Sequence, residues 1–196
     1  MTKSIVGSLF LLFLSSCDVI VNKFSFFPDQ ITVVPEKSLP AHCRKVSIVT
    51  TDKIRLDALY FTARDSSEKV VIYFHGNGGN IYHRMRECER LSAMGLNVLL
   101  VSYRGYAESE GSPSEKGVYI DGESAIQYAA NELHYTLNNV VVVGRSLGTA
   151  VAIEVSQSKR ISKLILITPL SSGGDMADVY GYGSLKFFNR KSVQFY

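Results

Sequence analysis

One serine in this sequence has the surroundings of an enzymatic nucleophile. Ser146 lies in the segment VVVVGRSLGTAVA, residues 140–152, where four valines predict a strand and the following residues predict a helix. A serine hydroxyl is a poor nucleophile near neutral pH and needs a general base beside it, usually a histidine. All the histidines of the chain precede this serine, at His42, His75, His83 and His134. The position of a base is therefore the first question that the sequence raises.

The glycines on either side of Ser146 have a steric purpose. A sharp turn from strand to helix forces strained dihedral angles on the serine, and side chains two residues away would collide with the neighbouring backbone. Gly144 and Gly148 occupy those two places. The turn would expose the Ser146 hydroxyl at the carboxyl edge of a parallel sheet, where open α/β sheets bind ligands.

The elements that must position this serine alternate between strand and helix. Residues 43–50 and 53–63 alternate apolar and polar residues around a short turn, which predicts an antiparallel hairpin. Further along, short apolar runs alternate with helical periodicity, and Ser114 can cap one of the helices. These runs predict strands at 69–74, 96–103, 140–143 and 163–168 and helices at 81–94, 118–133 and 147–158. We expect an α/β fold with a mostly parallel sheet and right-handed crossovers.

Composition excludes several other classes of protein. The chain has 196 residues, of which 46% are hydrophobic and 20% are charged, as in a single globular domain. Its net charge of +3 is scattered, which argues against a nucleic-acid-binding protein. The sequence has neither a P-loop nor a paired-cysteine motif, so we predict no cofactor and no metal.

The N-terminus resembles a bacterial lipoprotein signal. Lys3 precedes an apolar run over residues 5–14, which is shorter than the ~20 residues that span a membrane. The run ends in LSSC, which resembles a lipobox and predicts removal of residues 1–16 and lipidation of Cys17. An uncleaved anchor or an ordinary signal peptide with a chance cysteine is the alternative. Asp18 resembles an inner-membrane retention signal, so we expect a cell-envelope protein that is held to the inner membrane on its periplasmic side.

The residues after Cys17 leave two further expectations. Residues 17–42 contain three prolines and little periodicity, which predicts an extended tether. In an oxidising compartment Cys43 and Cys88 could form a disulfide, but two free thiols are an equal alternative.

Three blocks of the sequence together resemble the α/β-hydrolase superfamily, in the branch that includes bem-type hydrolases and acyl-protein thioesterases. They are FHGNGGN at 74–80, YRGYAESEGSPSEKGVYIDGESA at 103–125, and the segment around Ser146, and the resemblance extends from Val46 to Leu170. It implies a partial three-layer α/β-hydrolase domain over residues 43–170. It also implies a serine hydrolase that acts on ester, thioester or amide bonds of a small-molecule or acyl substrate.

The resemblance also assigns roles to residues around Ser146. The backbone N–H groups of Asn77 and Leu147 would form an oxyanion hole, and Leu147 would open a helix, where free amides favour negative charge. His75, Gly76, Gly144 and Gly148 would shape the site, with His75 a structural residue rather than a base. The remaining marked residues have simpler interpretations. We expect His83 and His134 to be surface or partly buried polar residues and Arg145 to face solvent or substrate. We also expect one loop to be held by Tyr103, Arg104, Gly105, Tyr106 and Asp121.

The rest of a catalytic triad has no counterpart in this sequence. In the superfamily an Asp or Glu follows the seventh strand and a His the eighth. Here residues 171–196 follow the sixth predicted strand and contain Asp175 and Asp178 but no histidine, so we expect the start of a cap region or an aberrant tail. The sequence thus predicts a truncated hydrolase with impaired activity, without the last two strands, and with an open sheet edge. A non-catalytic binding pseudoenzyme and the remnant of a frameshifted gene remain alternatives. The oligomeric state is not predicted.

Overall fold

A computed structural model describes residues 25–65, 67–157 and 159–169 of the chain. The chain divides into two compact units, and the unit Pro28–Leu170 contains the sheet and its helices. The other unit consists of residues 1–27 and 171–196, of which only 25–27 are described. The predicted signal peptide, Cys17 and the tail after residue 170 lie outside the described residues and stay predictions.

Six strands form one sheet in the order β1-β2-β4-β3-β5-β6. The strands are β1 (Cys43–Val49), β2 (Arg55–Phe61), β3 (Val70–Phe74), β4 (Asn97–Val101), β5 (Val140–Arg145) and β6 (Lys163–Ile167). The pairs β1–β2 and β2–β4 are antiparallel, whereas β4–β3, β3–β5 and β5–β6 are parallel. The predicted fold class, with its N-terminal hairpin and otherwise parallel sheet, is confirmed.

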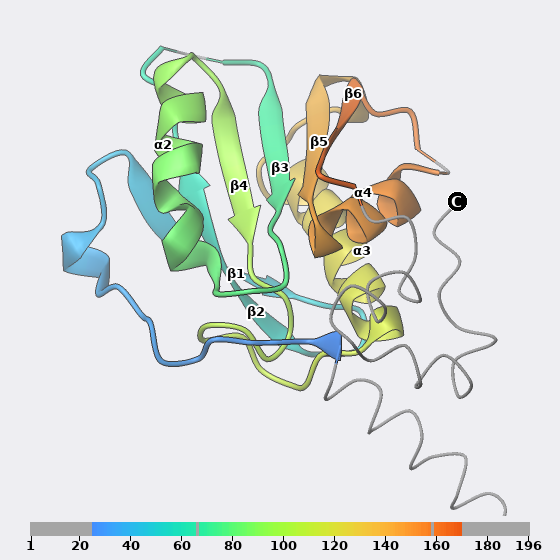
Figure 1. Ribbon diagram of the computed structural model, residues 1–196. Helices are drawn as coiled ribbons and strands as arrows, with labels where there is room; N and C mark the ends of the chain where they lie inside the picture. The colour runs from blue at the N-terminus through green and yellow to red at the C-terminus, as the bar shows by residue number, and fades with distance from the viewer. Residues whose placement is uncertain (1–24, 66, 158, 170–196) are drawn as a thin grey trace, which may run out of the picture. The chain divides into compact units, whose positions relative to one another are not determined.

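Helices cover both faces of this sheet (Figure 1). On one face lies α2 (Met85–Ala93), preceded by the 3-10 helix η2 (Ile81–Arg84). On the other face lie α3 (Glu115–Asn131) and α4 (Leu147–Ser156). Two further 3-10 helices, η1 (Glu36–Ser38) and η3 (Leu137–Asn139), precede β1 and β5.

The predicted capping residue lies where α3 begins. The Ser114 side chain accepts a hydrogen bond from the Gly117 N–H, as an N-cap does, so α3 begins at Glu115, three residues before the predicted start. The first predicted helix is also divided, because its first turn is the 3-10 helix η2. Asn80 caps η2 by accepting a hydrogen bond from the Tyr82 N–H.

A hydrophobic core lies between α2 and the sheet. Because alternate residues of a strand share a face, the same strands supply a second apolar layer to α3 and α4. The largest fully buried side chains include residues of β2, β3 and β4, and Val140 and Val142 of β5 are fully buried beside them. This close packing holds the carboxyl ends of β3, β4 and β5 in fixed positions. The core under α2 includes Leu59, Phe61, Val71, Tyr73, Val98, Leu100 and Cys88.

Both cysteines of the described chain are free thiols in this core. Cys43 begins β1 and Cys88 lies in α2, and both side chains are buried. Burial raises the pKa of Cys43 to about 12 and raises the pKa of Cys88 as well, since a thiolate is poorly solvated there. The free-thiol alternative is the one that the structure contains.

Candidate active site

Ser146 alone separates β5 from α4. Its backbone has φ 51° and ψ −117°, a left-handed conformation that costs a non-glycine residue about 1–3 kcal/mol. Bonds on both sides hold it there. The Ser146 N–H donates to the Ile167 carbonyl at 3.0 Å, and the Ser146 carbonyl accepts from the Thr149 N–H at 2.8 Å. The sharp turn expected from the sequence is present.

The flanking glycines make this turn sterically possible. A Cβ atom on Gly144 would lie 2.3 Å from the Gly148 carbonyl oxygen, and one on Gly148 would lie 2.1 Å from the Phe74 carbonyl oxygen. Both distances are far below van der Waals contact. The first turn of α4 therefore packs directly on the backbone at the end of β3, and this packing fixes the direction in which Ser146 leaves the sheet.

The loop after β3, residues 75–80, passes beside Ser146, and we call it the oxyanion loop. A Cβ atom on Gly76 would lie 3.4 Å from Ser146 Cβ, so the loop and the serine are in contact at Gly76. Asn77 follows directly, and its side-chain Oδ1 accepts a hydrogen bond of 2.6 Å from the Tyr106 hydroxyl. Leu147 is the first residue of α4. Both predicted oxyanion donors thus belong to residues that adjoin the contact between Gly76 and Ser146.

His75 is a fully buried residue of this loop. Its Nδ1 lies 2.7 Å from the Gly76 carbonyl oxygen, which can only accept, so Nδ1 carries the proton. Its ring packs against Tyr103 and Tyr106, with centroids at 4.6 and 5.4 Å. Burial lowers the pKa of His75 to about 4, so the ring is neutral at pH 7. Nε2 is buried and has no hydrogen-bond partner among the described residues.

No histidine hydrogen-bonds to Ser146 in the part of the chain that the structure describes, although that part contains all four. His42 lies beside the Phe61 ring, and His83 contacts the Asn80 side chain. His134 is exposed and has a positive φ. The described residues therefore bring the predicted nucleophile next to the residues of the predicted backbone donors, and no histidine among them hydrogen-bonds to this serine.

Arg145, the residue before Ser146, keeps 40% of its side chain exposed to solvent, as one of the two expectations has it, and forms an ion pair with α2. Its Nη1 lies 2.7 Å from Glu87 Oε1 of α2, and Glu87 Oε2 accepts a hydrogen bond of 2.6 Å from the Tyr73 hydroxyl. This chain of contacts ties the end of β5 to α2. Sequence reasoning missed Glu87 and Tyr73, because nothing in a helical or strand pattern identifies a partner 58 residues away.

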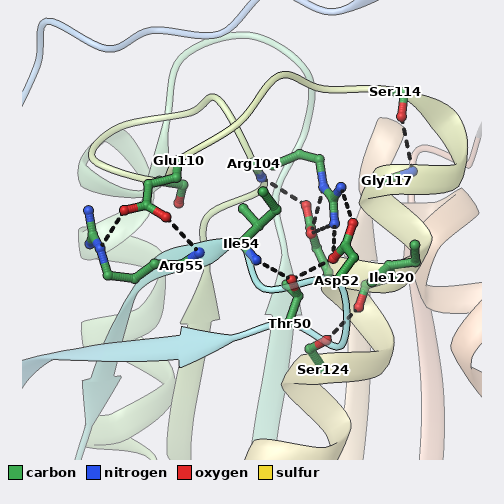
Figure 2. A network of polar contacts seen from close by, with 12 residues as sticks. Thr50, Asp52, Ile54, Arg55, Arg104, Glu110, Ser114, Gly117, Ile120 and Ser124 are labelled. Carbon is green, nitrogen blue, oxygen red and sulfur yellow. Dashed lines mark hydrogen bonds and ion pairs between the residues drawn. The ribbon is translucent and has the colours of Figure 1, made fainter.

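The loop after β4, residues 102–113, is held by an ionic network, and we call it the tyrosine loop. The Arg104 backbone N–H and Nε donate to the two carboxylate oxygens of Asp121 on α3 at 2.8 and 2.9 Å. Arg104 Nη1 also contacts Asp52 Oδ2 at 2.8 Å, and Asp52 accepts from the Thr50 hydroxyl (Figure 2). Hydrogen bonds from Arg104 and Thr50 lower the pKa of Asp52 to about 2. The expectation that Arg104 and Asp121 hold this loop agrees with the contacts.

Two negative observations complete the description of the site. Within the described residues, no group of three or more His, Cys, Asp or Glu side chains could hold a metal ion. The described helices are also too short or too polar for any of them to cross a membrane.

The fold and the serine turn together define a class of protein. Residues 69–193 match the family described as the alpha/beta hydrolase fold. The chain belongs to this family.

Several individual proteins resemble the chain. Protein bem46 of Schizosaccharomyces pombe is 39% identical over 167 residues, which is 81% of this chain and 56% of bem46. The alpha/beta hydrolase domain-containing protein WAV2 of Arabidopsis thaliana is 31% identical over 78% of this chain and 55% of its own length. The chain thus spans about half the length of these curated relatives.

Solved structures give the same fold. The esterase Pf2001 of Pyrococcus furiosus superposes with a TM-score of 0.66 and 25% identity, over 84% of this chain and 62% of the esterase. An alpha-beta hydrolase of Vibrio vulnificus superposes with a TM-score of 0.68 and 25% identity, over 77% of this chain and 57% of that chain.

Proposed function

We propose that this chain carries the nucleophile and oxyanion hole of a serine hydrolase that cleaves esters or thioesters through an acyl-enzyme. The observation that carries the proposal is the strained backbone of Ser146 in contact with the oxyanion loop at Gly76. Proteins keep such strain where it serves a function. Structural similarity to an esterase supports ester chemistry.

In the proposed reaction, Ser146 Oγ attacks the carbonyl carbon of the substrate while a base removes its proton. The N–H groups of Leu147 and Asn77 stabilise the negative charge that develops on the carbonyl oxygen, each by about 3–4 kcal/mol on the scale of oxyanion-hole mutants. The bond to the leaving group breaks as that group takes up the proton, and water then releases the acyl group from Ser146. The acid and base of the triad are proposed to come from residues other than those described.

A fluorophosphonate probe tests the nucleophile. We expect mass spectrometry of the purified 196-residue chain to find the phosphonyl group on Ser146, and S146A to remain unlabelled. Without a base the labelling should be about 10³-fold slower than in the Pyrococcus furiosus esterase. Labelling at another residue contradicts the assignment of Ser146, and labelling as fast as in that esterase contradicts the absence of a base.

A non-catalytic binding protein is the second candidate, and one observation favours it. Of the chain's four histidines, all within the described residues, none hydrogen-bonds to Ser146. If a folded chain resists labelling at every probe concentration yet binds an aryl ester with a saturable fluorescence change, this second function is supported.

Lipidation at Cys17, and through it a place on the inner membrane of a bacterial envelope, is part of the proposal for the whole protein. It is supported by the sequence LSSC after a short apolar run. Incorporation of radiolabelled palmitate during expression, lost in C17S but kept in C43S, is the expected result. Equal incorporation in C17S would exclude this site.

A further inference from the structure

The oxyanion loop has little means of holding its own conformation. Its sequence, HGNGGN, contains three glycines, and Gly79 has a φ of 76°. A Cβ atom on Gly78 would meet nothing within 4 Å, so no steric contact confines the chain there. Because glycine backbones are conformationally permissive, contacts from outside the loop must fix the Asn77 backbone.

The tyrosine loop supplies two such contacts. The Tyr103 hydroxyl donates to the His75 carbonyl oxygen at 2.8 Å, and the Tyr106 hydroxyl donates to Asn77 Oδ1 at 2.6 Å. Both tyrosines are fully buried, and their rings pack edge to face with centroids 5.8 Å apart. The two hydroxyls therefore hydrogen-bond to the oxyanion loop on both sides of Gly76, the residue that contacts Ser146.

The backbone between the two tyrosines is itself held by ion pairs and close packing. Arg104, between them in sequence, is tied to Asp121 and Asp52 (Figure 2). Gly105 has a φ of 77°, and a Cβ atom there would lie 2.7 Å from Pro113 Cδ. The loop thus turns sharply between Arg104 and Tyr106, which lets the two tyrosine rings pack on the same histidine.

We propose that Tyr106 is a positioning residue for the oxyanion hole, holding the Asn77 side chain so that the Asn77 N–H keeps its direction. This inference rests on the proposed function of the site. Tyr106 does not touch substrate in this proposal. Its hydroxyl acts through Asn77, and small displacements of a stabilising donor lower reaction rates strongly.

Y106F is the direct test, because it removes one hydroxyl and keeps the ring. Y60F is the matched control, since the Tyr60 hydroxyl also makes a partly buried hydrogen bond, 2.8 Å to the Tyr135 hydroxyl, in another part of the fold. N77A removes the same contact from the opposite partner. If the two side chains act as one unit, Y106F/N77A should behave like either single variant.

Two measurements separate this proposal from the proposed function. The first is hydrogen exchange of the amides in residues 75–80, which we expect to be about tenfold faster in Y106F and unchanged in Y60F. The second is the fluorophosphonate rate on Ser146, which we expect to fall about tenfold at saturating probe, with the half-saturating concentration unchanged.

Each outcome supports or overturns a specific statement. Unchanged exchange in Y106F overturns the positioning role, whatever happens at Ser146. Faster exchange with an unchanged labelling rate, or with a change in half-saturation alone, overturns it as well. Faster exchange in a chain whose Ser146 never reacts overturns the proposed function, while the hold of Tyr106 on the loop stands.

Discussion

The backbone conformation of Ser146, on which the proposed function rests, also lowers the stability of the fold. A left-handed φ at a residue with a Cβ atom raises the energy of the folded state, and only the surrounding packing keeps it. The packing here is the contact of α4 with the end of β3 and the hydrogen bonds of the Ser146 backbone. The proposed nucleophile therefore lies at a position where glycine would be the more stable residue.

Comparing S146G with S146A measures this strain, because both variants lose the hydroxyl. Glycine adopts the observed φ without a steric penalty but loses more backbone entropy on folding. We expect S146G to be more stable than S146A by about 1 kcal/mol in urea unfolding. Equal stabilities, or a more stable alanine variant, would show that the turn stores no strain.

Sequence patterns could identify the residues that form the sharp turn at Ser146. Ser146, Gly144 and Gly148 follow from a spacing of two residues around a strand-to-helix turn. The contact from Tyr106 to Asn77 joins positions 29 residues apart, and a side-chain contact of that kind depends on how two loops fold. The local sequence does not encode it.

At the scale of elements, the crossing of α4 over the end of β3 sets the geometry of the site. Gly148 is the closest point, since its backbone meets the Phe74 carbonyl with no space for a methyl group. Any enlargement there must push the helix away from the sheet. Because Ser146 directly precedes α4, such a shift would also move Ser146.

G148A should therefore lower the free energy of unfolding by at least about 3 kcal/mol, well beyond the usual effect of a single methyl group. G78A is the matched control, because a Cβ atom at Gly78 meets nothing within 4 Å, and we expect a change below about 1 kcal/mol. Thermal and urea unfolding of both variants give the comparison. Similar losses in the two variants would contradict the close contact.

Most elements could be predicted because their periods differ clearly. The apolar runs became β3 to β6, and the hairpin became β1 and β2. The helical periodicity predicts the start of α3 three residues too late, because residues 115–117 contain no large apolar side chain. The capping residue Ser114 marks the start of α3 better than the periodicity does. Residues 28–32 also hydrogen-bond to the oxyanion loop and the tyrosine loop, through Asp29, Gln30 and Thr32. The sequence could not predict these contacts, because the segment lacks periodicity.

At the scale of the whole molecule, β6 is the last strand of the described sheet. Leu164, Ile165 and Ile167 are each more than a third exposed on it. A strand edge with apolar side chains is a surface on which other chains can pair. The order of strands, with β4 between β2 and β3, could be expected only from the resemblance, because no local pattern specifies which strands become neighbours.

We expect the purified 196-residue chain to self-associate through this edge. I165K should raise the concentration at which it associates by about tenfold, which corresponds to a loss of about 1.4 kcal/mol in the free energy of association. Light scattering over a dilution series gives that concentration. I31K is the control, since Ile31 is 94% exposed but lies outside every strand. If I31K protects as well as I165K, general apolar exposure rather than the strand edge drives association.

The carbonyl of Asp29 gives the molecule an unusual mechanical arrangement. It accepts hydrogen bonds from Asn80 Nδ2 at 3.1 Å and from the Ala107 N–H at 2.9 Å, so one oxygen joins the oxyanion loop to the tyrosine loop. The Gln30 side chain donates to the Gly105 carbonyl beside it. Tension applied to the chain before Pro28 would load these bonds before it reached any strand of the sheet. A pull on that end of the polypeptide would then first change the spacing of the oxyanion loop and the tyrosine loop at Asn80 and Ala107.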